Sequence, residues 1–394
     1  MPRTAVFTLA LTLVAGSADA QVPARSEQGA AERRLVLSGQ VGFRIEFMSN
    51  ENFAENDATR DDDARLRFRA RLRVAGRYDV SDQVTLGFRV STGSTAYPSS
   101  GWSSLNDDFR RDQLALDRVY VILRPRNELQ LQFGFNANPL FRPTELVWDS
   151  DVSPGGFAEI LRLGGVEFVA GQFMLREVRT LRPGNQQNGF LFAHGISYVK
   201  DGPVEVRVGA FNYLYTDADV IAQALDEGSL DSDFQTNRFQ PGAADFFFSE
   251  FNIFGASVSV SSGQVRFVAE GSINAGAKRD AAMGVAYADR ENLAAGGMLT
   301  VGRLQDAWDW QLSAGFFHIE ADAVIAAYNS DDLQQTNVNT VPIVARLRLP
   351  GGAGLTWDSY IQSKIDNNLA SNGGIIHDEN ATKLRTRLTI QASF

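Results

Sequence analysis

The stretch TKLRTRLTIQASF (residues 382–394) alternates apolar and polar side chains up to its last residue. One face carries Leu384, Thr386, Leu388, Ile390, Ala392 and Phe394, and the other carries Lys383, Arg385, Arg387, Thr389, Gln391 and Ser393. Side chains that repeat with a period of two point to opposite sides of an extended strand. The stretch therefore predicts a β-strand with one largely apolar face and one cationic face.

The stretch RLRFRARLRV (residues 65–74) shows the same period with a stronger contrast in charge. Its arginines occupy every second position: Arg65, Arg67, Arg69, Arg71 and Arg73. A basic run that binds nucleic acid is usually unstructured or helical, and residues two apart do not share a helix face. We therefore expect a second strand with a wholly apolar face, and no nucleic-acid partner.

Composition and the N-terminus indicate an exported protein. The chain has 394 residues, no cysteine and a formal net charge of −10. Residues 1–20 are expected to be a secretory signal peptide, in which Arg3 precedes an apolar run and Ala18-Asp19-Ala20 forms the cleavage pattern. We expect residues 21–34 to form a short periplasmic segment. The lack of cysteine suits passage through an oxidising periplasm.

About sixteen runs with period-two alternation follow from residue 35 onwards. They lie near 35–48, 65–79, 83–93, 113–124, 128–136, 157–164, 166–176, 190–200, 203–214, 250–261, 264–275, 293–304, 307–319, 339–349, 353–365 and 380–394. Short turns alternate with long polar loops between these runs. That sorting is typical of a barrel with short periplasmic turns and long extracellular loops. The fold class expected for residues 35–394 is therefore all-β, a transmembrane antiparallel β-barrel of about 16 strands.

The last residue resembles the C-terminal signature by which bacterial outer-membrane barrels are presented to their assembly machinery. Phe394 ends an alternating strand, as in that signature. We therefore expect Phe394 to be the assembly signal, the barrel assembly machinery to be a partner, and the bacterial outer membrane to be the location. Barrels of 16–18 strands leave an aqueous channel, whereas about 8 strands fill their own interior. The inner face is therefore expected to be polar and wet.

The segment at 116–158 resembles the proteobacterial "putative porin" family of sixteen-stranded channels. An Asn-Pro turn and a Trp-Asp-x-Asp-x-x-Pro-x-Gly-like loop match at Asn138, Pro139, Leu146, Val147, Trp148, Asp149, Asp151, Pro154 and Gly156. The resemblance implies a passive diffusion channel for small hydrophilic solutes that assembles as a homotrimer. It also implies that the third loop, at 137–156, folds into the lumen and forms a constriction with Arg142, Glu145, Asp149 and Asp151.

The arginines are expected to line the lumen, because an arginine that faces lipid at the bilayer midplane costs about 2–4 kcal/mol. Closure of the barrel places the last strand beside the first. Arg385 and Arg387 should therefore lie near the row from Arg65 to Arg73, with Arg89 on the next strand. A basic wall opposite an acidic loop predicts a transverse field and a preference for small anions. Alternatively, the arginines only satisfy a wet lumen and pair with loop acids.

Acidic runs such as 61–63 and 331–332 are expected to be solvated loop tips, since they lack the spaced pattern of a calcium loop. Catalytic and metal-binding motifs do not occur. The histidines are His194, His318 and His377, and none lies in a nucleophile motif, so we expect no enzyme, no cofactor and no metal. Expected partners are outer-membrane lipid and lipopolysaccharide, together with small hydrophilic solutes.

The serious alternative is an outer-membrane barrel that acts in binding, adhesion or structure without significant conductance. The long loop near 215–249 is large enough to present a surface. At its end, residues 246–248 are three consecutive phenylalanines, which either start the next strand or form an exposed contact patch.

Overall fold

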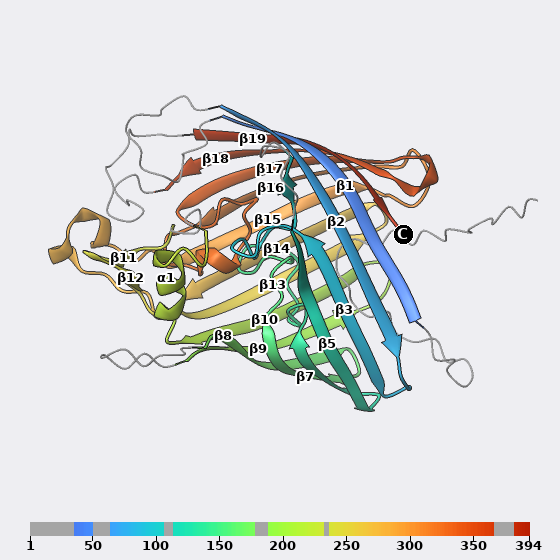
Figure 1. The fold of residues 1–394 in the computed structure, drawn as a ribbon, viewed down its shortest axis with the longest axis horizontal. Coiled ribbons are helices and arrows are strands. Elements are labelled where there is room, and N and C mark those ends of the chain that lie inside the picture. The colour runs from blue at the N-terminus through green and yellow to red at the C-terminus, as the bar shows by residue number, and fades with distance from the viewer. Residues whose placement is uncertain (1–34, 50–63, 106–112, 178–187, 232–235, 366–381) are drawn as a thin grey trace, which may run out of the picture.

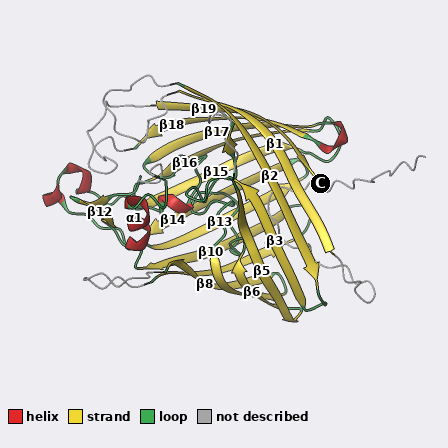
Figure 2. Ribbon diagram, in the orientation of Figure 1, coloured by secondary structure: helices red, strands yellow, loops and turns green. Residues whose placement is uncertain are grey.

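The computed structural model describes residues 35–49, 64–105, 113–177, 188–231, 236–365 and 382–394. Within these ranges the chain is mostly β-structure (Figure 2). The expected signal peptide at 1–20, the segment at 21–34, the acidic run at 61–63 and His377 lie outside the described residues. Among the described residues, no helix is long and apolar enough to cross a bilayer.

Sixteen long strands make up the main sheet. They are β1 (Leu35–Ser49), β2 (Arg65–Asp79), β3 (Val84–Thr92), β5 (Leu114–Arg126), β6 (Leu129–Phe135), β7 (Gly155–Leu163), β8 (Val166–Arg176), β9 (Gly189–Lys200), β10 (Glu205–Thr216), β13 (Asn252–Ser262), β14 (Val265–Asn274), β15 (Leu293–Gly302), β16 (Trp310–Ile319), β17 (Val338–Arg348), β18 (Gly354–Lys364) and β19 (Thr382–Ser393). Each predicted run corresponds to one of these strands, and the ends agree within a few residues.

The smaller elements lie in the connections. They are β4 (Ser103–Ser104), which pairs with β2, the separate hairpin of β11 (Phe239–Gln240) and β12 (Ala243–Phe247), the helix α1 (Asp219–Asp226), and the 3-10 turns η3 (Ala281–Met283), η4 (Val285–Tyr287), η5 (Ala326–Tyr328) and η6 (Pro350–Gly352). Phe247 ends β12, and Phe247 and Phe248 are buried. The three phenylalanines therefore belong to a folded loop and neither begin β13 nor form an exposed patch.

The main sheet closes on itself (Figure 1). Each long strand pairs antiparallel with its neighbour along the chain, and β1 pairs with β19 over Gln40–Ser49. At this seam Gly39 and Phe394 exchange backbone hydrogen bonds of 2.8 and 3.0 Å. Closure leaves no unpaired edge, which a strand in lipid requires. The prediction of a sixteen-stranded antiparallel barrel is confirmed.

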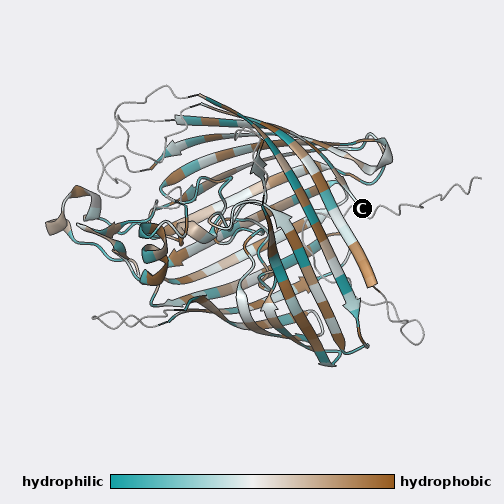
Figure 3. Ribbon diagram, viewed as in Figure 1, coloured by the Kyte–Doolittle hydropathy of each residue, from teal (hydrophilic) through white to brown (hydrophobic). Residues whose placement is uncertain are grey.

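Alternating side chains sort between the two faces of the barrel, as the hydropathy colouring shows (Figure 3). On β19, Leu388 is 45% exposed on the outside whereas its neighbour Arg387 is 3% exposed on the inside. The same contrast separates Phe68 from Arg69 on β2. Because successive side chains of a strand point to opposite faces, one sequence pattern supplies both the apolar exterior and the polar interior.

The described parts of four long connections fold into the interior. We call them loop 2 (93–105), loop 3 (136–154), loop 5 (217–231 and 236–251) and loop 7 (320–337). The largest apolar cluster joins loop 3, loop 5 and loop 7 to inner side chains of the wall, and includes Leu146, Trp148, Tyr213, Ile221 and Ile325. The barrel is therefore not an empty cylinder, because loop 3, loop 5 and loop 7 pack together against its inner wall.

Candidate functional site

The arginine row of β2 lies on the inner face of the barrel. Arg67, Arg69, Arg71 and Arg73 contact groups of other strands and of inward-folded loops, while the intervening Leu66 and Phe68 are 55% and 48% exposed on the outside. Arg65 is partly buried at the beginning of the strand. The alternation of a single strand thus places a dense row of guanidinium groups along one side of the lumen.

Glu46 of β1 is the first acidic partner of this row. It is fully buried, and its carboxylate accepts a 2.8 Å hydrogen bond from Nε of Arg67. Arg69 lies 3.8 Å away on the same carboxylate. Glu46 was not among the predicted residues, although the alternation of Phe43, Ile45 and Phe47 with Arg44 and Glu46 carries the signal. The arginine row is therefore partly neutralised by its own barrel wall.

Asp151 of loop 3 is the second partner. Its carboxylate lies 2.6 Å from Arg73 and 3.8 Å from Arg71. Burial acts to raise the pKa of Asp151, but the adjacent Arg73 and then Arg71 outweigh it and hold the pKa below its ordinary value. Loop 3 thus reaches the arginine wall with an ionised side chain.

The other predicted residues of loop 3 have different contacts. Ser150 and Ser330 donate to the carboxylate of Glu145, Asp149 accepts from the backbone N–H of Asp151, and Arg142 donates to the carbonyl oxygen of Trp148. Burial raises the pKa of both Glu145 and Asp149. These three residues therefore shape loop 3 and join it to loop 7, while Asp151 alone among the four contacts the arginine row.

The centre of loop 3 is apolar. Leu146, Val147 and Trp148 are almost completely buried. Trp148 stacks on Tyr213 of β10 with ring centroids 5.8 Å apart, and on Tyr328 of loop 7 at 5.3 Å. The indole N–H also donates to the carbonyl of Val152 at 3.1 Å. Loop 3 is therefore held inside by stacking between two aromatic side chains, one on the wall and one on another loop.

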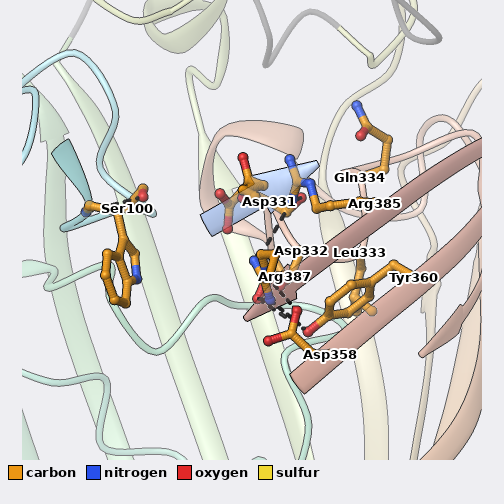
Figure 4. A network of polar contacts seen from close by, with 12 residues as sticks. Ser100, Asp331, Asp332, Leu333, Gln334, Asp358, Tyr360, Arg385 and Arg387 are labelled. Atoms are coloured by element: carbon orange, nitrogen blue, oxygen red, sulfur yellow. Dashed lines mark hydrogen bonds and ion pairs between the residues drawn. The ribbon is translucent and has the colours of Figure 1, made fainter. Parts of the chain in front are cut away.

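Arg385 and Arg387 of β19 face loop 7 next to the closure seam (Figure 4). Arg387 donates to Asp332 at 2.7 Å and to the hydroxyl of Tyr360 at 2.9 Å, and it also contacts Asp358 of β18. Arg385 lies 3.4 Å from Asp332. Asp331 and Asp332 were expected to be solvated tips, but this expectation is wrong, because loop 7 folds inward and places them against two arginines.

The pKa values of the two neighbouring acids of loop 7 are shifted in opposite directions. Burial acts to raise the pKa of Asp332, but Arg387 and Arg385 hold it well below its ordinary value. Burial, followed by the charge of Asp332, raises the pKa of Asp331 to about 7. Asp332 is therefore a permanent anion, whereas Asp331 changes its charge near neutral pH.

Loop 2 adds an aromatic side chain to the same wall. The ring of Trp102 contacts the guanidinium groups of Arg44 and Arg71, whose central carbons lie 4.0 and 4.5 Å from the ring centroid. Its carbonyl oxygen accepts a 2.7 Å hydrogen bond from Arg69. Such cation–π contacts stabilise closely spaced cations without neutralising them. Neither Trp102 nor Arg44 was predicted. A polar loop shows no pattern that predicts where Trp102 folds, whereas Arg44 lies on the polar face of β1, where the alternation of the strand carried the signal.

The wall continues over β3 and β5. Arg89 lies 2.7 Å from Asp117, and Arg118 donates to the hydroxyl of Ser153 in loop 3 at 3.0 Å. The predicted Arg89 thus lies next to the β2 row, and Arg118 is an additional inner arginine. Phe394, the predicted assembly signal, ends the seam with its side chain 55% exposed.

Among the described residues, no group of three or more His, Cys, Asp or Glu side chains could hold a metal ion. His194 and His318 both lie on outward positions of their strands, away from the lumen, and His318 Nδ1 lies 2.8 Å from Asn339. The described inner face of the barrel offers guanidinium groups, carboxylates and hydroxyls.

Comparison with solved structures agrees with the fold. The chain is similar to Salmonella typhi OmpF in complex with daunomycin, at 11% identity and a TM-score of 0.54, over 92% of this chain and 98% of that one. It is also similar to an anion-selective porin from Comamonas acidovorans, at 12% identity and a TM-score of 0.53, over 92% of this chain and all of that one. No curated protein sequence matches the chain.

A family comparison gives the identity of the chain. The model of the family described as "Putative porin" matches residues 20–240, which is more than half of the 394 residues. That range covers the arginine strand β2, loop 2 and loop 3. The fold of the remaining residues completes the same closed barrel. The protein is therefore an outer-membrane barrel that belongs to the "Putative porin" family.

Proposed function

We propose that this porin passes small hydrophilic solutes by passive diffusion and prefers anions. Family and fold support a porin channel, and the charge balance of the inner wall supports the preference. The proposed function is non-enzymatic and needs no cofactor. The predicted residues of the arginine wall and Asp151 of loop 3 form the proposed constriction.

The charge balance is the observation that carries the anion preference. The inner wall near loops 2, 3 and 7 carries nine described arginines: Arg44, Arg67, Arg69, Arg71, Arg73, Arg89, Arg118, Arg385 and Arg387. Among the described residues, the carboxylates in ion pairs with them number five: Glu46, Asp117, Asp151, Asp332 and Asp358. Burial raises the pKa of nearby Glu145 and Asp149, and it raises that of Asp331 to about 7, so burial acts against the ionisation of these three acids. Cations therefore exceed anions along this wall.

A passage between charged walls focuses the field of those charges on the solute. The pairing of individual arginines reduces this field but does not cancel it, since several carboxylates each serve two guanidinium groups. The ion pairs and the surplus of arginines support the proposal that paired and unpaired charges coexist on this wall. Loop acids and wall acids pair with the arginines, and an excess of positive charge remains.

Purified protein in planar bilayers tests the proposal. We expect stepwise conductance and a reversal potential, measured in a salt gradient, that indicates anion preference. Arg69→Glu with Arg71→Glu should move the potential toward cations. The matched control is Arg279→Glu with Arg303→Glu, which makes the same change in charge at two exposed positions outside the strands. Absence of conductance would refute the channel, and cation preference of the unaltered protein would refute the selectivity.

A second candidate is a barrel that binds or anchors without significant conductance. The observation that favours it is the filling of the lumen by loop 3 and loop 7, whose central residues are buried against each other and against the wall. Under this alternative the bilayer experiment gives no steps. Deletion of residues 326–332, the described inner part of loop 7, should then create a conductance that the unaltered protein lacks.

We also propose that copies assemble as a homotrimer, and that the protein contacts outer-membrane lipid, lipopolysaccharide and the barrel assembly machinery through its C-terminal Phe394. The exposed apolar exterior supports the lipid contact. The position of Phe394 at the open end of the seam, where its backbone pairs with Gly39, supports its role as a terminal signal. Deletion of Phe394 should lower the amount of assembled barrel in the membrane.

A further inference from the structure

In the middle of its strands, one part of the outer wall departs from the apolar pattern; the outward pair His318 and Asn339 lies instead near strand ends. On the outer face of β7, β9 and β10 lie Glu159, His194 and Asn212, of which Glu159 and His194 are exposed and Asn212 is half-buried. These three side chains point outward, because the side chains at alternate positions of the same region are exposed apolar residues of the outer face. Leu161, Phe168 and Ile196 are 37%, 42% and 46% exposed on this side. A carboxylate, an imidazole and an amide thus emerge from a surface that otherwise faces lipid.

The strand register brings these polar groups into one row. Glu159 is opposite Ala170, Ala170 is opposite His194, and His194 is opposite Asn212. The row therefore crosses four adjacent strands, with a small side chain between the carboxylate and the imidazole. Asn212 extends it further, since its amide donates to the side chain of Asn252 on β13 at 2.8 Å.

The row does not lie at a membrane surface. Glu159 is the central residue of β7 (Gly155–Leu163), and His194 is near the centre of β9 (Gly189–Lys200). Hydrocarbon offers no hydrogen-bonding partner at that depth, so polar side chains there are rare and are usually covered by protein. Exposure of this row to lipid would therefore destabilise the barrel.

The opposite wall provides the internal comparison. On β1, β2 and β19 the corresponding outward side chains are apolar, as shown by Phe43, Phe68 and Leu388, which are 54%, 48% and 45% exposed. That wall suits lipid without any partner. The wall of β7 to β10 is less suited to lipid, because it carries polar side chains at a depth where the opposite wall is apolar.

The surface around the row is also hollowed. A shallow depression of about 670 Å³ is lined by Glu159, His194 and Asn212 together with Ala170, Ala210 and Ile196. The small side chains of the two alanines leave space at its base, and the apolar side chains around it can pack against the apolar exterior of another barrel. A partner with a similar outer wall can therefore approach closely here and still supply polar groups.

We propose that this face, from β7 to β10, is the contact between copies of this chain. The face carries a carboxylate acceptor together with imidazole and amide groups, so a second copy presents complementary partners to it. Copies in one membrane share one orientation and associate around an axis along the membrane normal, which gives closed rings. The inference deepens the proposed homo-oligomer by locating its interface, and it is independent of conductance.

Ala210→Trp tests the interface, because the new side chain fills the depression from outside and leaves the inner wall unchanged. Ala314→Trp is the matched control, an exposed outward alanine on β16, four strands along the barrel from β10. Mass is measured by light scattering during size exclusion in mild detergent, and folding by heat-modifiable gel mobility. We expect the unaltered protein and Ala314→Trp to be oligomers, and folded Ala210→Trp to be a single copy.

A second variant, Glu159→Leu, distinguishes a position that faces lipid from a position between copies. If Glu159 faces lipid, leucine leaves the oligomer unchanged and raises the unfolding temperature of the barrel, which would overturn the inference. If Glu159 lies between copies, leucine weakens association, which supports it. A single-copy unaltered protein overturns the interface together with the oligomer, whereas an oligomer that survives Ala210→Trp overturns the interface alone. Conductance per copy, measured on the same samples, reports separately on the channel.

Discussion

Asp151 in loop 3 lies 2.6 Å from the guanidinium of Arg73 on β2. The two residues are far apart in sequence, yet the contact defines how loop 3 approaches the arginine wall. Arg71 shares the same carboxylate at 3.8 Å. One loop acid therefore moderates two wall cations, and its removal changes the field of the passage more directly than removal of any other described acid of loop 3.

Asp151→Asn is expected to increase anion preference. The amide keeps the size of the side chain but removes the charge that offsets Arg73 and Arg71, so the reversal potential in a salt gradient should shift further toward anions. Asp201→Asn, in an exposed short turn, is the matched control and should leave the potential unchanged. A shift toward cations in Asp151→Asn would contradict the assignment of Arg71 and Arg73 to the conducting wall.

Asp332→Asn is expected to destabilise the barrel and to loosen loop 7. It leaves Arg385 and Arg387 without their shared carboxylate, and loss of one partner of a mostly buried ion pair costs about 2 kcal/mol after allowance for its partial exposure. The temperature at which the gel mobility changes from folded to unfolded should therefore fall. Asp306→Asn, whose side chain is 77% exposed, provides the comparison and should not move it. Equal midpoints in both variants would show that Asp332 does not anchor loop 7.

The barrel strands could be predicted because each must satisfy the same local rule. In a strand between lipid and water, apolar and polar side chains alternate, so the sequences of β2 and β19 are by themselves enough to predict a strand. Chain order then fixes the pairing, because neighbours along the chain are neighbours in the sheet and only the seam between β1 and β19 is long-range. The inner position of Arg385 and Arg387 followed from that rule alone.

The interior contacts of the loops could not be predicted, because no local pattern encodes them. Asp332 looks like a solvated acid until β19 supplies Arg387, and Trp102 shows nothing in the sequence that links it to Arg44. The inward folding of loop 3 was predicted only from the resemblance to a family. Glu46 was within reach of sequence reasoning, since its strand was predicted and its position on the polar face follows from the alternation.

Trp148→Ala is expected to enlarge the passage. The indole stacks between Tyr213 and Tyr328 and is almost fully buried, so its loss removes the aromatic contact that joins loop 3 to loop 7 and to the wall. Truncation of a buried aromatic side chain costs about 3–5 kcal/mol. Single-channel conductance should rise and become noisier as loop 3 is released. Trp308→Ala removes an indole that is 63% exposed in a short turn, and its conductance should match that of the unaltered protein. Unchanged conductance in Trp148→Ala would mean that loop 3 does not limit the passage.

Anion preference is expected to decrease as the pH rises through about 7. Burial and the charge of Asp332 raise the pKa of Asp331 from 3.8 to about 7, so Asp331 is neutral in acid and ionised in mild alkali. Its new negative charge then offsets part of the excess carried by Arg69 and Arg385. The raised pKa also means that protonation of Asp331 stabilises the fold. This contribution is complete below the ordinary pKa and is lost as the pH rises through 7.

Reversal potentials between pH 5 and pH 9 measure this effect. The unaltered protein should lose part of its anion preference over that interval, with a midpoint near pH 7. In Asp331→Asn the same curve should be flat at the acidic value, because the amide cannot ionise and resembles the protonated acid in charge. Asp289→Asn, which changes a carboxyl group outside the strands and away from the arginine wall, should retain the pH dependence. A pH dependence that persists in Asp331→Asn would assign the titration to another group and remove Asp331 from the conducting wall.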